Sequence, residues 1–272
     1  MTLKWHNEQT NKEYDFLSDS KCNSIEGIGI EKEVNSSSIA GYDGSVITST
    51  STPEREISLS ISIPNTTDSR LKLVSVVSGY GSLFIDDKFI DGFVSGIDYS
   101  DTSALFINTQ ISIICPDPYF HNKDQESKVM ASVTPLFRFP HLFNGDFMLS
   151  KVAERVIDNF FNKSTVDVQP IIYFKANSAL ANPSIMNVST YEKSKLLVSM
   201  SANDVIRIDT RIGKKTIHKI TNNGETNIFN CIASDFKFLK LYAGDNWLKY
   251  DADTNPNGLQ VTLQWTVNYG GV

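Results

Sequence analysis

Apolar and polar residues alternate strictly in two stretches of this chain. Between Ile57 and Ile63 every second residue is isoleucine or leucine, and the residues between them are serines. Between Leu259 and Val267 apolar residues alternate in the same way with glutamine and threonine. Because successive side chains of a β-strand point to opposite faces, this period of two predicts two half-buried antiparallel strands.

Shorter apolar runs predict further strands. They are Ser82–Ile85, Gly92–Tyr99, Gln110–Cys115, Gln169–Lys175, Leu196–Ser201, Val205–Asp209 and Phe236–Tyr242. Residues that favour turns separate these runs at 41–44, 86–87, 222–224, 243–246 and 255–258. Many short strands with regularly placed turns indicate a mainly β fold of the sandwich or barrel class.

One helix is expected among the strands. Asp68 suits an N-cap, Leu71, Val74 and Val77 would share one face, and Gly79 can end the helix.

A second segment, 149–160, fits two structures. Its apolar residues fit a helical stripe, but 156–161 also fits a strand followed by a turn at Asn162, and the period alone does not decide between them.

The chain of 272 residues is long enough for two ordinary domains. Pro116 and Pro118 remove two ladder donors, so a strand should stop before them. The segment 121–135 that follows is polar and is typical of a linker. The sequence therefore predicts an N-terminal domain over 1–135, linker included, and a C-terminal domain over 136–272.

Charge and cysteine content narrow the possible functions. A net charge of −6 gives no electrostatic attraction to nucleic acid, so DNA or RNA binding is not expected as the main role. Three cysteines, widely spaced and odd in number, do not suggest a disulfide framework. The first residues lack an apolar signal segment and no run approaches 18 apolar residues, so we expect synthesis in a cytoplasm and no membrane insertion.

Motifs for chemistry are missing from the sequence. There is no Gly-x-Ser-x-Gly elbow, no phosphate-binding glycine loop and no histidine pair at zinc-ligand spacing. We therefore expect no enzyme, no catalytic residues, no metal site and no cofactor.

Two acidic clusters could have suggested otherwise. Asp86 and Asp87, with Asp91 nearby, might form a glycosidase carboxylate pair, but adjacent strand residues point to opposite faces, so a hairpin turn is favoured. The segment 251–258 resembles a calcium loop. It has Pro256 where that loop needs glycine, so a connection between two strands is favoured.

Two tryptophans near the C-terminus differ in their setting. Trp265 is in phase with the apolar face of its strand, so we expect it in the core. Trp247 lies beside a turn and is the candidate for an exposed ligand-binding residue.

Short strings over nearly the whole chain resemble one family, the distal tail proteins of siphophages. The strings are Gly41–Gly44, Arg55–Leu59, Gly81–Ile85, Gly92–Ile97, Cys115–Phe120, Phe137–Pro140, Asp204–Thr210, Ala243–Asn246 and Trp265–Val272. The region 143–168 departs from the family because it has two asparagine-centred turns, at Asn144 and at Asn159, where one is expected. The resemblance also favours a connector and strand over a helix in 149–160.

The resemblance implies a fold and a role. The fold would be two β-sandwich domains, the first with a short helix and an extended hairpin and the second galectin-like. Six copies would form a baseplate hub ring at the virion tail tip. The ring would join the tail tube protein to the tail-associated and receptor-binding proteins, with viral DNA passing through without specific binding. A ring needs heterologous contacts that close, and exposed strand edges can supply them.

Two other classes remain open. A galectin-like fold could be a carbohydrate-binding module that contacts the host surface, although fold alone does not give function. A glycosidase or esterase would need a site assembled from dispersed residues.

Overall fold

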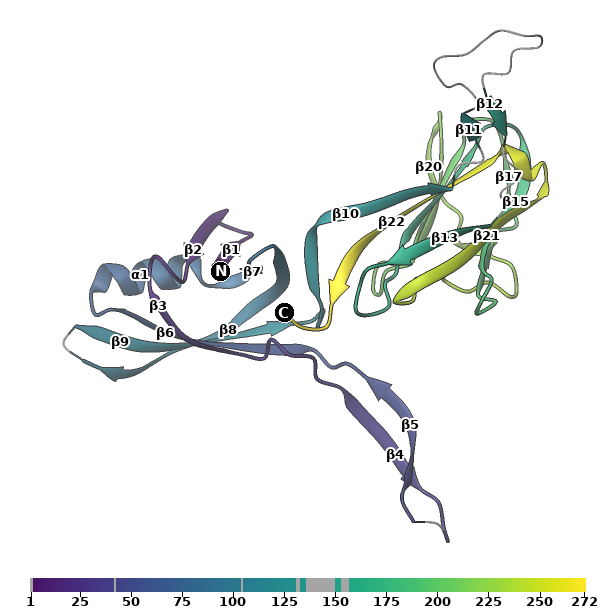
Figure 1. Cartoon of the computed structure of the whole chain (residues 1–272). Coiled ribbons are helices and arrows are strands. Elements are labelled where there is room, and N and C mark those ends of the chain that lie inside the picture. Colours follow the sequence, from purple (N-terminus) through teal and green to yellow (C-terminus); the bar gives the residue numbers. More distant parts are fainter. Residues whose placement is uncertain (1, 42, 104, 131–132, 136–149, 153–156) are drawn as a thin grey trace, which may run out of the picture. The chain divides into compact units, whose positions relative to one another are not determined.

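A computed structural model describes residues 2–41, 43–103, 105–130, 133–135, 150–152 and 157–272 (Figure 1). The protein is mainly β, as predicted. It divides into unit 1, residues 1–123 with 268–272, and unit 2, residues 124–267. The chain therefore leaves unit 1 once and returns to it with its last five residues.

Unit 1 is built from antiparallel strands and one helix. Its elements are β1 (Leu3–Asn7), β2 (Lys12–Asp15), β3 (Lys21–Glu26), β4 (Glu33–Ser38), β5 (Ser45–Ser51), β6 (Arg55–Pro64), α1 (Thr67–Val76), β7 (Gly79–Ile85), β8 (Lys88–Thr102), β9 (Phe106–Cys115) and the start of β10 (Phe120–Met130). The long strand β8 joins two runs of paired strands, β2-β1-β7-β8 and β8-β9-β6-β3. The core includes the fully buried Trp5, and α1 contacts β1, β2 and β6.

Among the described residues, unit 2 holds two larger sheets around a second core and, separately, a two-stranded sheet. Its strands are the rest of β10, β11 (Val133–Pro135), β12 (Ser150–Val152), β13 (Ile157–Asn162), β14 (Ile171–Ala176), β15 (Leu180–Asn187), β16 (Lys193–Lys195), β17 (Ser199–Met200), β18 (Val205–Asp209), β19 (Thr216–Thr221), β20 (Gly224–Asn227), β21 (Gly244–Thr254) and β22 (Leu259–Tyr269). Short 3-10 turns occupy η1 (Phe229–Cys231) and η2 (Pro256–Gly258). One sheet has the order β22-β14-β18-β19-β20 and the other β13-β21-β15-β16.

The two alternating stretches form the strands that the period predicted. In β6 all four apolar residues from Ile57 to Ile63 are fully buried. In β22 the apolar residues from Leu259 to Val267 are buried, and Trp265 is among them. The other predicted runs lie within or overlap β7, β8, β9, β14, β17 and β18, with one exception.

The exception is Phe236–Tyr242, where the strand prediction is wrong. Only Leu241 pairs there, in an isolated bridge with Val168. Elsewhere the backbone bonds to single partners, with Lys237 N–H donating to the carbonyl of Lys193. Phe236 packs edge-on against Phe238. Aromatic packing, rather than a sheet ladder, therefore accounts for the apolar pattern of this segment.

The helix exists, but its buried face was mispredicted. Thr66 is the N-cap, because its side chain accepts from the N–H of Ser69, so the helix begins before Asp68. Leu73, Val76 and Val77 are buried, whereas Leu71 and Val74 are exposed. Apolar residues occupy both faces, and only the contact with β1, β2 and β6 selects which one is buried.

The polar segment predicted as a linker is a strand over most of its length. Residues 120–130 form β10, so the linker prediction for 121–135 is wrong there, and the two compact units divide after Lys123. The ambiguous segment contains strands at 150–152 and 157–162. The predicted strings at Phe137–Pro140 and around Asn144 lie outside the described residues.

Candidate functional site

The acidic cluster after β7 forms the turn that was predicted. Asp86 has a left-handed φ of 54°, and its carboxylate accepts the N–H of Thr2 at 2.7 Å. The Asp87 carboxylate accepts from the Lys88 ammonium, and Asp91 accepts from the Ser82 hydroxyl. The three carboxylates therefore serve three different local contacts and do not face one substrate bond.

The calcium-like segment also lies between two strands, as predicted. Asp253 is paired with Lys195, whose Nζ lies 2.7 Å from Oδ1, and it also accepts from the Asn182 amide. Within the part of the chain that the structure describes, no three histidine, cysteine or acidic side chains are grouped to hold a metal. No described helix is long and apolar enough to cross a membrane.

Trp247 lies on β21 with half of its surface exposed. Its strand partner on β13 is Asn159, and the exposed Ile157 and Phe161 are two residues to either side of that partner. The Asn159 side chain is already bonded: its Nδ2 donates to Asp245 and its Oδ1 accepts from the N–H of Asn246. Trp247 thus belongs to an apolar patch whose neighbouring amide is engaged within the protein.

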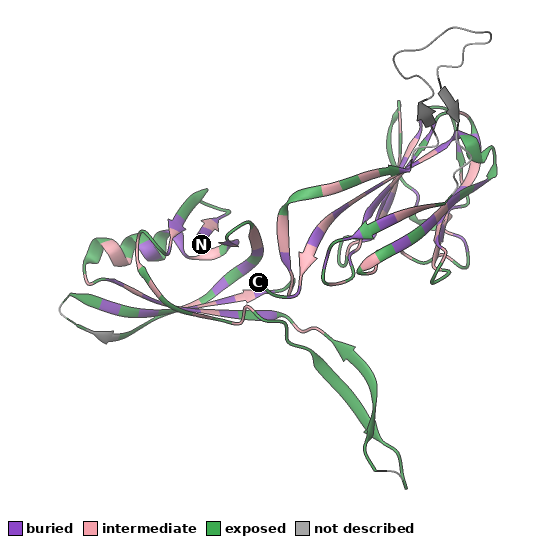
Figure 2. Ribbon diagram, in the orientation of Figure 1, coloured by how far each residue is buried: buried purple, intermediate pink, exposed green. Residues whose placement is uncertain are grey.

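A different feature of unit 1 stands out, a hairpin that we call the arm. Strands β4 and β5 pair only with each other among the described residues, from Glu33 opposite Ser51 to Ser38 opposite Ser45. Every residue of both strands is exposed, and Figure 2 shows the arm in the colour for exposed residues along its length. The arm has no hydrophobic core of its own.

The composition of the arm is unusual for a solvent-exposed hairpin. Most residues of its strands are serine or threonine, Glu33 is the single charged residue, and neither strand contains lysine, arginine or proline. Val46 and Ile47 expose 51% and 62% of their surface. Proteins commonly protect free sheet edges with charges or prolines, and an isolated two-stranded hairpin is marginally stable in water. The arm therefore has the properties of a segment that pairs with a partner.

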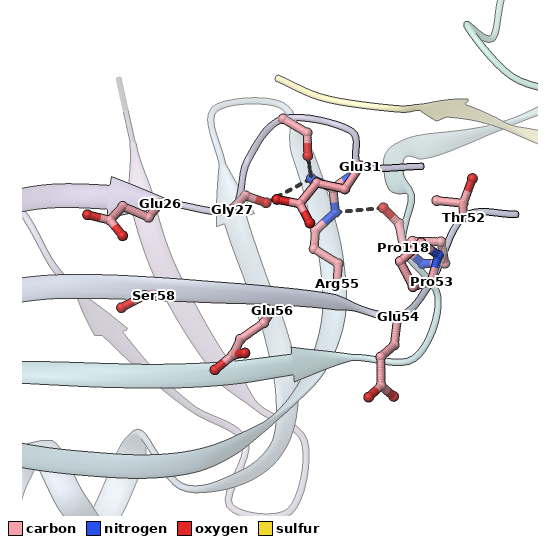
Figure 3. A pocket seen from close by; sticks show the side chains of 11 residues that line it. Glu26, Gly27, Glu31, Thr52, Pro53, Glu54, Arg55, Glu56, Ser58 and Pro118 are labelled. Atoms are coloured by element: carbon pink, nitrogen blue, oxygen red, sulfur yellow. Dashed lines mark hydrogen bonds between the residues drawn. The ribbon is translucent and has the colours of Figure 1, made fainter. Parts of the chain in front are cut away.

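The two ends of the arm meet at Arg55, directly before the alternating part of β6. Its guanidinium donates four hydrogen bonds, all to backbone carbonyls: Nη1 to Gly27 at 2.8 Å and Gly29 at 2.6 Å, Nε to Pro118 at 2.7 Å and Nη2 to Gly270 at 2.6 Å (Figure 3 shows those to Gly27 and Pro118). Its side chain also lies over the Phe120 ring at 5.0 Å. One side chain thus links three separate segments.

Arg55 is only 6% exposed. Burial lowers the pKa of the guanidinium from its ordinary value, because water is removed from a charged group. Arginine nevertheless stays charged in proteins, so the four carbonyl dipoles supply the stabilisation that water would otherwise give. Such a group would be costly to bury without this full set of acceptors.

The glycine at the start of the arm is required by close packing. Gly27 has a φ of +80°, and a Cβ there would lie 2.0 Å from the carbonyl oxygen of Glu56. The chain leading into β4 therefore lies directly on β6.

The C-terminal tail, residues 268–272, packs against the same place. A Cβ on Gly270 would lie 2.8 Å from the side chain of Ile30, and a Cβ on Gly271 would lie 3.0 Å from the carbonyl of Ile28. The Lys88 ammonium lies 4.8 Å from the centre of the Tyr269 ring. The tail is therefore in close contact with the segment that leads into the arm.

A cavity of about 300 Å³ opens beside Arg55 at this root (Figure 3). Its lining includes four carboxylates, those of Glu26, Glu31, Glu54 and Glu56. Residues from both ends of the arm thus surround one cavity.

Sequence reasoning did not identify Arg55 as a structural centre. The sequence does contain relevant signals, namely the Gly27-x-Gly29 pair and the glycines at the C-terminus. These signals do not reveal that residues 27, 29, 118 and 270 meet, because that depends on the tertiary fold.

Comparison with known protein families finds a match within the second half of the chain. Residues 163–269 match the model of the siphovirus-type tail component, C-terminal domain. This part of the chain is therefore similar to a siphophage tail component domain. The resemblance to the distal tail proteins of siphophages is thereby confirmed.

Solved structures of similar fold cover nearly the whole chain. The crystal structure of the SPP1 Dit (gp 19.1) protein, a paradigm of hub adsorption apparatus in phages that infect Gram-positive bacteria, has a TM-score of 0.69 at 14% identity and covers 98% of both chains. A chain in the phage P2 baseplate, in its activated conformation with Ca, has a TM-score of 0.50 at 9% identity, with 100% of this chain and 99% of that chain covered. At these identities the similarity shows a shared fold. No curated protein matched in sequence.

Proposed function

We propose that this tail component is the subunit of a baseplate hub ring at the tip of a siphophage tail. The ring, of six copies, joins the tail tube protein to the tail-associated and receptor-binding proteins. The role is structural rather than catalytic. The family match over 163–269 and the shared fold with SPP1 Dit over 98% of the chain support this proposal.

The observation that carries the ring proposal is the arm. Its strands are exposed, among the described residues they pair only with each other, and apart from Glu33 they lack the charges and prolines that protect such edges. A ring forms when one surface of a subunit binds a different surface of the next and the rotation closes. An arm that adds to a neighbouring subunit provides such a heterologous contact.

The charge of the chain fits a channel through which DNA passes. With a net charge of −6 per copy, a ring of this protein has no general attraction for phosphates. DNA can then move through its centre without specific binding. In this proposal the ring is located at the tail tip of the virion, and its subunits are synthesised in the host bacterial cytoplasm.

The test is the solution mass, measured by light scattering across concentration. We expect a discrete species near six times 30.3 kDa, or a stacked double ring. Replacement of residues 32–52 by a short Gly-Ser connection should give a folded monomer, whereas Trp247→Ala in unit 2 should leave the mass unchanged. A monomer at every concentration, even with the tail tube protein added, would contradict the ring.

A second candidate function is carbohydrate binding by the predicted galectin-like domain. The observation in its favour is the half-exposed Trp247, since saccharides stack on such rings. Saccharide binding on a glycan array that Trp247→Ala abolishes would support it. An empty array would leave structural support of partners as the role of unit 2.

A further inference from the structure

We infer that Arg55 and the C-terminal tail together position the arm, so that Arg55 is a positioning residue for assembly. The contacts at the base of the arm support the inference that Arg55 and the tail position it. The consequence of this positioning for ring assembly rests on the proposed function.

Arg55 connects the two ends of the arm. Residues 27–32 lead into β4, and Arg55 follows the short segment 52–54 that leaves β5. The Arg55 side chain holds the carbonyls of Gly27 and Gly29 on the incoming side. One residue thus closes the hairpin at its base, since its backbone belongs to the outgoing side.

The base of the arm is attached to the connection between β9 and β10. Nε of Arg55 holds the carbonyl of Pro118 in the connection between β9 and β10. In the same connection, the Tyr119 hydroxyl lies 3.4 Å from the Thr52 hydroxyl on the outgoing side of the arm. The base is therefore fastened to the body of unit 1 from both sides.

The C-terminal tail contacts both Arg55 and the incoming end of the arm. Nη2 of Arg55 donates to the carbonyl of Gly270, and Ile30 packs where Gly270 has no side chain. The tail is held in turn by Asn268, whose amide oxygen lies 2.9 Å from Nδ1 of His121. The tail thus covers the incoming end of the arm and shares its anchor.

Because all residues of both strands are exposed, the direction of the arm is set at its root. A six-residue strand is roughly 20 Å long, so a tilt of about 10° at the root displaces the tip by about 3.5 Å, close to the spacing of about 4.8 Å between paired strands. A loosened root would therefore misalign the arm with a neighbouring sheet edge.

The experiment is hydrogen exchange on the full chain and two variants, with solution mass measured in parallel. Arg55→Lys keeps the charge but loses the planar fork, because an ammonium cannot reach carbonyls in three segments at once. Deletion of residues 270–272 keeps Arg55 and removes its fourth acceptor. Arg70→Lys is the matched control, since Arg70 lies in unit 1 and bonds to Asn65 and Thr66.

We expect exchange in peptides covering 27–32 and 52–55 to rise at least tenfold in Arg55→Lys and in the same direction in the deletion. Exchange in the rest of β6 (56–64) and in unit 2 should stay as in the unaltered protein, and Arg70→Lys should change nothing. Unchanged exchange at the root in both variants would overturn the inference. So would loss of protection in β6 to the same extent, because Arg55 would then be a general core residue.

The solution mass of the variants distinguishes a failure of this inference from a failure of the proposed function. A loosened root with loss of the ring supports both. A loosened root with an unchanged ring mass supports the positioning by Arg55 and contradicts arm-mediated assembly.

Discussion

Nη2 of Arg55 donates a hydrogen bond of 2.6 Å to the carbonyl oxygen of Gly270, a residue 215 positions further along the chain. This bond ties the base of an exposed arm to the last residues of the protein. It explains why the tail of β22 belongs to unit 1 although most of that strand lies in unit 2. The contacts of unit 1 are therefore complete only when residues 268–272 are in place.

Two glycines of β8 should respond differently to the same substitution. A Cβ on Gly92 would lie 2.7 Å from the side chain of Ile113 and 3.0 Å from Sγ of Cys115, whereas the nearest atom to a Cβ on Gly96 is a carboxylate oxygen 4.0 Å away. Gly92→Ala should lower the free energy of unfolding by about 1–3 kcal/mol through overpacking. Gly96→Ala should change it by less than about 0.5 kcal/mol. Denaturant unfolding measures both, and equal effects would contradict the packing argument.

Asn246 is a buried amide at the start of β21 that holds a turn of unit 2. Its Nδ2 donates to the carbonyls of Tyr242, Gly244 and Phe160, and its Oδ1 accepts from the N–H of Tyr242. Asn246→Asp keeps the shape but replaces these donors by a buried negative charge, and should cost about 3 kcal/mol or more.

The matched control is Asn257→Asp, the same change at an exposed residue. Thermal unfolding of unit 2 should be shifted strongly by the first substitution and little by the second. Similar shifts would mean that the bonds of Asn246 do not stabilise the turn.

His121 makes unit 1 sensitive to pH. Burial lowers the pKa of its ring, but the Asp117 carboxylate, 3.4 Å from Nε2, and the Asn268 amide outweigh burial, so the pKa is raised above its ordinary value of 6.5. Because the folded pKa is above the unfolded one, the protonated ring stabilises the fold. This contribution is complete below about pH 6.5 and is lost as pH rises through the raised pKa.

The check is thermal stability of unit 1 between pH 5.5 and 8.5, together with the same series for Asp117→Asn. The unaltered protein should lose stability as pH rises through this window, and the loss should be smaller in the variant. A stability that rises with pH relative to the variant would contradict the sign.

The buried Cys115 thiol should be unreactive in the native protein. Burial raises the pKa of Cys115 to about 12 and also raises the pKa of the half-buried Cys22. Since the thiolate is the reactive form, Cys115 should resist a charged thiol reagent at pH 8 in the native protein and react only on unfolding of unit 1. Mass spectrometry of labelled peptides measures this. Early labelling of Cys115 would show that its surroundings open in the native state.

Local pattern was sufficient where one face of a strand is buried. The isoleucines of β6 and the apolar residues of β22 are separated by polar residues, so their period marks a strand before any partner is known. The turn at Asp86-Asp87 follows from residue type in the same way, and so does the burial of Trp265.

The pattern failed where burial does not alternate. Strand β10 was predicted as a linker because its middle is polar, with buried residues only at Phe120 and Met130. Its backbone is paired whether or not its side chains are buried, and a period of two appears only when one face is covered. In α1 the pattern was also insufficient, because apolar residues lie on two faces of the helix. Packing against β1, β2 and β6 selects the face that is buried.

By itself, therefore, the sequence determined the mainly β class, the principal strands and turns, and the resemblance to siphophage tail proteins. The tertiary structure alone decided which helix face is buried, that the arm pairs with no other strand among the described residues, and that Arg55 meets carbonyls at 27, 29, 118 and 270. The reason is physical. Strand period and turn chemistry are properties of neighbouring residues, whereas the acceptors of a buried guanidinium come from segments that only the folded chain brings together.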